Sequence, residues 1–169
     1  MIGNEEALRG AAALIEFETA LLRTRQFLSW LDLFTLDATY WLPVSPEQTD
    51  PFTDPSHIYE SRPALDARVE RLRDPRVLPQ TPVSRVSRLL GRPWLISASD
   101  DLIEVAVTFH IVESRAAGSS RDDALRIFAG DARYAMVPDE HAVMKLKIKS
   151  KRVDLVNSES AFFGVSILL

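Results

Sequence analysis

The sequence predicts an α+β fold in which N-terminal helices pack on one face of a strongly curved, mostly antiparallel sheet. Apolar residues recur at helical spacing over the first part of the chain, whereas they alternate with polar residues over most of the second half. Helices followed by successive strands with short turns are typical of this layer arrangement. A length of 169 residues suits one domain spanning residues 1–169.

Two helical stretches are expected before the first strand. The first has apolar residues at the i, i+4, i+7 spacing of one buried face, namely Leu8, Ala12, Ile15 and Leu22, with Thr19 as its weak member. The second is predicted from Arg25 to Leu36 and gathers large side chains on one face, namely Phe27, Trp30, Leu31 and Phe34. Because a lone helix cannot bury such side chains, Trp30 and Phe34 are predicted to be structural core residues.

A strand and a third helix are expected next. Residues 38–42 are rich in strand formers, which assigns Tyr40 and Trp41 a structural role in this strand. A long loop punctuated by prolines follows from 44 to 57, and loops of this length usually have a function or cover something. Ser61 is a predicted N-cap for a short helix whose buried stripe consists of Leu65, Val69 and Leu72.

The rest of the chain is predicted to be mainly strand. Apolar residues occupy every second position from 103 to 111, namely Ile103, Val105, Val107, Phe109 and Ile111, and 115–123 are predicted to form a loop. A second long strand is expected from 125 to 137, broken or bulged near Gly130. The lysines then recur at period two, which predicts a solvated row of charge on one strand face: Lys145, Lys147, Lys149 and Lys151.

Composition excludes several functional classes. The net charge of -4 and pI of about 5.4 are unsuited to nucleic acid. No apolar run approaches the roughly 20 residues of a membrane span, and the polar N-terminus does not resemble a signal peptide, so a cytoplasmic protein is expected. The chain has no cysteine, which excludes thiol chemistry and Cys-ligated iron–sulfur clusters in this chain.

Candidate catalytic residues are few, and none forms a recognised motif. The three histidines are far apart in sequence, so no metal site is expected. His110 lies on a strand face with polar neighbours and is a candidate pocket base if that face lines the concave side. The alternative is a satisfied, half-exposed histidine. Asp37 and Tyr40 are a second candidate pair at a helix-to-strand junction, although Asp37 also fits a local helix-ending role.

Arginine dominates the basic residues. Sixteen of the twenty basic residues are arginines, and eight of those lie between Arg62 and Arg92. Because the planar guanidinium suits interfacial carboxylates, we predict subunit-interface roles for Arg62, Arg68, Arg85 and Arg88. The alternative is a genome that prefers arginine codons. Arg85 and Arg88 are three apart on a predicted strand, which puts them on opposite faces.

Four segments, in order, resemble the small (β) subunits of Rieske-type aromatic-ring-hydroxylating dioxygenases. Residues 14–43 resemble the opening helix of that family, followed by W-L and then D-A-x-Y-W-x-P. Residues 58–72 resemble its next conserved stretch. The remaining two segments are P-x-S-R at Pro82–Arg85 and K-x-V-x-L-x-N at Lys151–Asn157.

The resemblance implies a cystatin-like cone, the nuclear-transport-factor-like fold shared with ketosteroid isomerase and scytalone dehydratase. It also implies a non-catalytic chain without cofactors that supports an α subunit in an assembly of three α and three β chains. The Rieske cluster and the mononuclear iron are expected in that α partner. The alternative is a free-standing dehydratase, isomerase or hydrolase of the same fold that uses His110, Asp37 or Tyr40. An open cone with converging polar groups favours that enzyme, and a filled cone favours the supporting subunit.

Overall fold

The computed structural model describes residues 3–74, 76, 83–114, 125–160 and 167–169. The described residues form helices α1 (Asn4–Arg23), α2 (Phe27–Leu31) and α3 (Arg62–Arg73). The strands are β1 (Phe34–Pro43), β2 (Ser56–Ser61), β3 (Arg85–Leu90), β4 (Trp94–Ala98), β5 (Ile103–Ser114), β6 (Arg126–Pro138) and β7 (Leu146–Leu155). The predicted loop at 115–123 lies outside the described residues.

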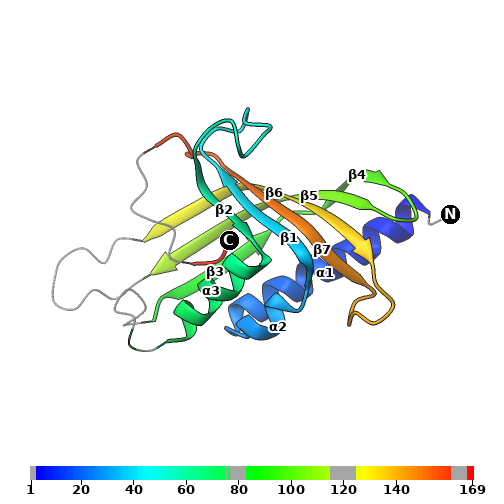
Figure 1. Cartoon of the computed structure of the whole chain (residues 1–169), viewed down its shortest axis with the longest axis horizontal. Coiled ribbons are helices and arrows are strands. Elements are labelled where there is room, and N and C mark those ends of the chain that lie inside the picture. The colour runs from blue at the N-terminus through cyan, green and yellow to red at the C-terminus, as the bar shows by residue number, and fades with distance from the viewer. Residues whose placement is uncertain (1–2, 75, 77–82, 115–124, 161–166) are drawn as a thin grey trace.

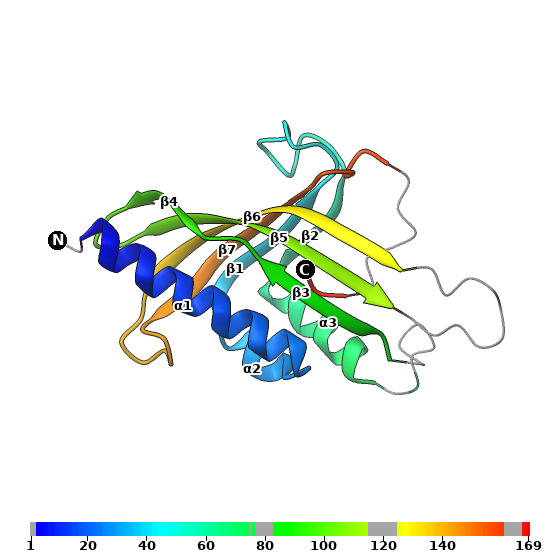
Figure 2. The same cartoon turned by 180° about the vertical axis from the view of Figure 1, so that it is seen from behind.

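The strands form one curved sheet in the order β2-β1-β7-β6-β5-β3, with β4 also paired to β5 (Figure 1). The described pairs are antiparallel apart from the parallel pair β1–β7. Helix α1 crosses the concave side of the sheet, with α2 and α3 beside it (Figure 2). The predicted α+β cone, with N-terminal helices on a curved sheet, is confirmed.

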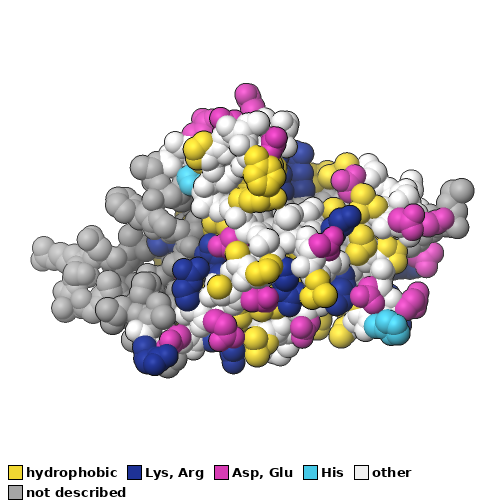
Figure 3. Space-filling view, in the orientation of Figure 1, with side chains coloured by type: hydrophobic (Ala, Val, Ile, Leu, Met, Phe, Trp, Pro, Cys, Tyr) yellow, Lys and Arg dark blue, Asp and Glu magenta, His cyan; other side chains and the backbone are white. Residues whose placement is uncertain are grey.

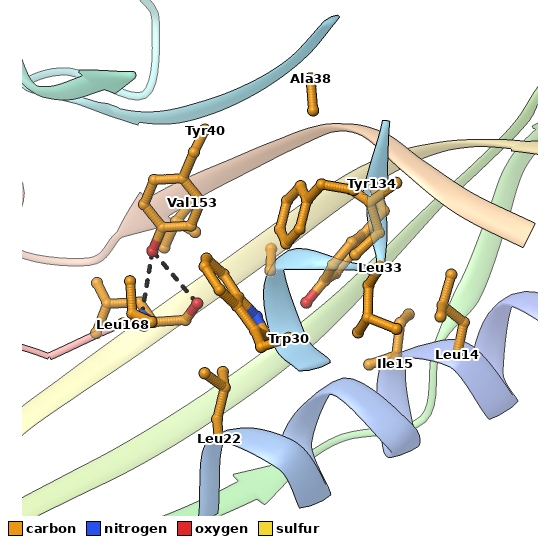
Figure 4. Close-up of a cluster of buried hydrophobic side chains, with 14 of the residues drawn as sticks. Leu14, Ile15, Leu22, Trp30, Leu33, Ala38, Tyr40, Tyr134, Val153 and Leu168 are labelled. Carbon is orange, nitrogen blue, oxygen red and sulfur yellow. Dashed lines mark hydrogen bonds between the residues drawn. The ribbon is translucent and has the colours of Figure 1, made fainter. Parts of the chain in front are cut away.

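The hydrophobic core lies between the helices and the concave face. Leu14 and Ile15 of α1 and Leu65 and Val69 of α3 are at most 1% exposed. Trp30 of α2 belongs to the same core and is fully buried (Figure 4). Burial of each large apolar side chain stabilises the fold by about 1.5–3 kcal/mol, so this layer holds the helices on the sheet.

The second helix is shorter than the sequence predicts. It ends at Leu31, and Phe34 is the first residue of β1 rather than part of a helix to Leu36. The amide of Ile148 donates a 2.7 Å hydrogen bond to the carbonyl of Leu33. Pairing with β7 therefore takes up the backbone groups that a longer helix would have used, and Phe34 stays buried beside Trp30 with ring centroids 4.7 Å apart.

The lysine row is interrupted by a β-bulge, and the prediction that Lys151 is solvated is wrong. Ala135 pairs with Ser150, but Met136 pairs with Ile148, so Lys149 is an extra residue in β7. The extra residue reverses the alternation of side chains along the strand. As a result Lys149 is exposed, whereas Lys151 points into the core and is 2% exposed.

Gly130 lies at a close backbone contact, and the predicted bulge near it is wrong. Its pairing with Phe109 of β5 and with Leu155 of β7 is regular. A Cβ atom built on Gly130 would lie 2.0 Å from the carbonyl oxygen of Asp154. Glycine is therefore required because the β7 backbone occupies the space of a side chain.

Gly130→Ala is expected to lower the free energy of unfolding by at least about 1–3 kcal/mol, because β6 and β7 must move apart to admit the methyl group. Gly10→Ala in α1 is the matched control. There the nearest atom to a new Cβ is Leu146 Cδ1 at 3.5 Å, so the change should raise stability by about 0.5–1 kcal/mol. Urea denaturation of both variants checks the pair. Equal midpoints would contradict the close contact at Gly130.

Candidate functional site in the cone interior

The structure does not bring the three candidate catalytic residues together. Val107, Phe109 and Ile111 face the concave side, so His110 between them is exposed on the outer face of β5. Asp37 is exposed in β1, where the nearby Thr35 hydroxyl is the main cause of its lowered pKa.

Tyr40 alone of the three candidates points into the cone. It is 1% exposed, and its hydroxyl donates to the carbonyl of Leu169 at 3.3 Å and accepts from the Leu169 amide at 3.1 Å (Figure 4). Its partners therefore come from the chain itself, and His110 and Asp37 do not share its site.

The polar centre of the cone is instead Glu18 of α1. One carboxylate oxygen accepts hydrogen bonds from Trp30 Nε1 at 2.9 Å and from Lys151 Nζ at 2.8 Å. The other oxygen accepts from the hydroxyl of Tyr134 at 2.7 Å. The Glu18 and Lys151 side chains are 2% and 3% exposed, so this is a buried ion pair with additional donors.

The sequence contained a signal for Glu18 that the helical prediction missed. The most buried stripe of α1 is offset from the predicted one and includes Ala7, Ala11, Leu14, Glu18 and Leu21. A carboxylate on the buried face of a helix needs a partner in the core, because an isolated buried charge is very costly. That partner is Lys151, which the period-two spacing of the lysines places in the solvated row.

Burial governs the ionisation of this cluster. It lowers the pKa of Lys151, and the nearby Glu18 carboxylate opposes that shift. Burial, and secondarily the charge of Glu18, raises the pKa of Tyr134 well above its ordinary value. Tyr134 therefore keeps its proton at neutral pH and serves as a donor to Glu18, not as a base.

The cone interior is closed. The cavity next to Glu18, Tyr134 and Lys151 measures about 20 Å³. That is room for about one water molecule, whereas small-molecule sites usually measure about 300–1,000 Å³. Leu168 and Leu169 are 2% and 4% exposed, and Leu169 lines this cavity. These converging polar groups stabilise a packed core and leave no room for a substrate.

Alkaline pH should destabilise the fold through its buried tyrosines. Burial raises the pKa of Tyr40 from 10.0 to about 12. The folded state then holds a proton that the unfolded state releases, so this stabilisation is present below about pH 10 and is lost as the pH rises to about 12. Tyr134 acts in the same direction. Lys151 acts in the opposite direction from the two tyrosines, at lower pH. Because its pKa is lowered in the folded state, its contribution to the free energy of unfolding rises with pH until the lysine of the unfolded chain loses its proton.

Tyr40→Phe should therefore lose less stability than the wild type between about pH 9 and 11, with a difference approaching 1–2 kcal/mol. Urea denaturation of the wild type and of Tyr40→Phe at about pH 9 and at about pH 11 measures this difference in the free energy of unfolding. Parallel losses in the two proteins would show that Tyr40 titrates normally.

Three of the four candidate interface arginines are engaged within the chain. Arg62 contacts Asp66 and the Phe34 carbonyl, at 3.0 and 3.1 Å. Arg68 forms a two-pronged pair with Glu60. Arg88 faces inward and donates to the Leu168 carbonyl. Arg85, the first residue of β3, is exposed and lines the same concavity as Arg88. Their predicted role at subunit interfaces stays a prediction.

The proline-rich loop is attached to the sheet through Arg152 and Trp41. The Arg152 guanidinium lies 4.5 Å from the Trp41 ring and donates to the carbonyls of Gln48 and Pro46 at 2.6 and 2.9 Å. Trp41 Nε1 donates to the Ser56 hydroxyl at 2.8 Å. On the face of the molecule shown in Figure 3, acidic, basic and apolar side chains are interspersed.

Two further properties describe the part of the chain that the structure covers. No described helix is long and apolar enough to cross a membrane. The described His, Asp and Glu side chains also do not gather in groups of three or more that could hold a metal ion.

Over the described residues, a curved sheet with N-terminal helices and an interior filled by its own side chains defines a cone without an open central pocket. The family model described as "Ring hydroxylating beta subunit" matches residues 17–160. The chain belongs to this family.

Relatives with known names agree with this assignment. The chain is 29% identical over 103 residues to "Toluate 1,2-dioxygenase subunit beta" of Pseudomonas putida, covering 58% of this chain and 64% of that protein. The match thus spans slightly less than two thirds of that relative's length. The crystal structure of the β subunit of benzoate 1,2-dioxygenase from Burkholderia mallei is 27% identical, with a TM-score of 0.69 and coverage of 90% and 93%. Naphthalene 1,2-dioxygenase shares the fold at 16% identity, with a TM-score of 0.78 and coverage of 99% and 88%.

Proposed function

We propose that this chain is the non-catalytic structural β subunit of an aromatic-ring-hydroxylating dioxygenase and supports an iron-bearing α subunit. The observation that carries this proposal is the closed cone. The only candidate catalytic residue that points into it, Tyr40, is bonded to Leu169, and the adjoining cavity is about 20 Å³. A free-standing enzyme of this fold would need room for its substrate at that position.

The redox groups are proposed to lie in the α partner. A Rieske cluster requires cysteine as well as histidine ligands, and this chain contains no cysteine. The relatives are named as subunits of toluate and 2-halobenzoate dioxygenases, which favours an α partner that acts on aromatic rings during their catabolism. We further propose a cytoplasmic assembly of three α and three β chains, in which the β chains associate as a trimer.

Co-expression of this chain with a candidate α subunit tests the proposal. The two chains should copurify in equal amounts, with the mass of a three-α three-β assembly in light scattering. The assembly should dihydroxylate an aromatic substrate when supplied with O₂ and electrons, whereas this chain alone should not. Failure to copurify with an α subunit encoded beside it would contradict the proposal.

His110→Ala and Asp37→Asn provide the test of catalytic roles. Both side chains are exposed on the outside of the cone, so turnover of the assembled enzyme should change by less than about threefold. General acid–base groups typically contribute about 10²–10⁴ in rate. A loss of about a hundredfold with the assembly intact would favour a direct chemical role for this chain.

A further inference from the structure

A second concavity lies outside the closed interior, at the mouth of the cone. It measures about 310 Å³, within the size range of small-molecule sites. It lies between the end of α1, the start of α2, the end of α3, strand β3 and the C-terminal residues. We call it the arginine cleft, because four arginines are among its lining residues: Arg23, Arg25, Arg85 and Arg88.

The described lining of the arginine cleft is basic and apolar, and the nearest named acidic influence is Glu18 of the adjoining interior, which acts electrostatically on Arg88. Among the described residues that line it, none is Asp or Glu. Arg23 and Arg85 are exposed and have no ion-pair partner among the described residues. The Nε atom of Arg88 is buried without a hydrogen-bond partner in the described part of the chain. Four cations around one concavity repel one another, and a bound anion would relieve that repulsion.

Arg25 occupies a backbone position that glycine normally fills. Helix α1 ends with hydrogen bonds from the amide of Arg25 to the carbonyl of Leu22 and from the amide of Gln26 to the carbonyl of Leu21. Arg25 itself has a φ of 57°, in the left-handed region. Glycine is favoured there, because a side chain adds a cost of about 1 kcal/mol. Its guanidinium donates a 3.4 Å hydrogen bond to the carbonyl of Leu72, so Arg25 connects the end of α1 to the end of α3 beside the cleft.

The remaining wall of the arginine cleft is apolar. Arg25 lies 5.0 Å from the centre of the Phe27 ring. The other apolar lining residues are Leu22, Leu72, Val86, Ile167 and Leu168. The cleft therefore combines forked cationic donors with a surface that favours a flat hydrocarbon body.

We propose that the arginine cleft binds a small arene carboxylate, with the carboxylate held by Arg85 and Arg23 and the ring against Phe27 and Val86. Guanidinium groups bind carboxylates through paired charge-assisted hydrogen bonds. The concave shape favours a small molecule over the flat surface of a partner protein. This inference is independent of the proposed α subunit, because the site is formed by one chain.

Calorimetric titration of the full-length chain with benzoate is the test. Benzoate should bind saturably at a single site, whereas benzamide, which lacks the charge, and acetate, which lacks the ring, should bind at least about tenfold more weakly. Arg85→Gln and Arg23→Gln should each weaken benzoate binding by about tenfold or more. Both replaced side chains are exposed, so the fold should be retained, and a thermal melt of each variant checks this.

Arg9→Gln is the matched control. It removes the same charge from an exposed position of the same helix, about 21 Å from Arg23 along α1. Benzoate affinity should change by less than about twofold. Equal losses in Arg9→Gln and Arg23→Gln would overturn the proposal, because they would indicate general charge attraction. Absence of saturable binding at about 10 mM benzoate would also overturn it. So would an Arg85→Gln variant that binds benzoate normally but assembles poorly with an α subunit, which would make Arg85 an interface residue.

Discussion

Trp30→Ala is expected to lower the free energy of unfolding by about 3–5 kcal/mol. The indole is fully buried, and its centroid lies 4.7 Å from that of Phe34 and 6.4 Å from that of Tyr40. Truncation removes these contacts and leaves a cavity that α2 and β1 can close only partly. It also removes the N–H group that donates to Glu18, so a buried carboxylate loses one of its donors.

Two companion variants separate these effects. Trp30→Phe keeps an aromatic ring but removes the indole N–H, and it should cost about 1–3 kcal/mol. Trp94→Ala removes an indole that is 44% exposed on β4 and should cost less than about 1 kcal/mol. Urea denaturation of all three gives the comparison. A Trp30→Ala midpoint close to that of Trp94→Ala would contradict the central position of Trp30 in the core.

The sequence predicted those features that depend on local pattern. The stripe of α3 and the alternation along β5 follow from spacing alone, and their residues Leu65, Val69 and Ile103 are buried as expected. The layer order also follows, since helices precede most of the strands. Such patterns are set by which side chains must leave water, and the chain carries that information residue by residue.

The features that were missed depend on residues far apart in the chain. Phe34 joins β1 because its neighbour Leu33 bonds to β7, more than a hundred residues later. The bulge at Lys149 is visible only in the register between β6 and β7. A shift of one residue reverses every side chain beyond it, which is why Lys151 was assigned to the wrong face.

The same limit applies to the site. Glu18 and Lys151 are separated by 133 positions, and each looks like an ordinary surface residue by itself. The closure of the cone by Leu168 and Leu169 likewise depends on where the chain returns after β7. The sequence is compatible with either an open or a filled cone, and only the three-dimensional packing shows that the cavity beside Glu18 measures about 20 Å³.

Lys151→Met is expected to lower the free energy of unfolding by about 3–5 kcal/mol, because it leaves the Glu18 carboxylate buried without its cation. The two charges lie 2.8 Å apart, and both side chains are almost inaccessible to water. Lys149→Met is the matched control on the same strand. Its side chain is exposed, so this change should alter stability by no more than about 0.5 kcal/mol.

A double-mutant cycle with Glu18→Gln tests whether the pair, and not the lysine alone, is responsible. In the wild-type background, Glu18→Gln should destabilise, because it leaves Lys151 charged and buried. In the Lys151→Met background the same change should recover about 1–2 kcal/mol, because it removes the remaining buried charge while its amide oxygen still accepts from Trp30 or Tyr134. Urea denaturation of the four proteins measures the cycle. If Glu18→Gln destabilises both backgrounds equally, the two charges are not coupled, and the polar centre of the cone is a set of independent hydrogen bonds.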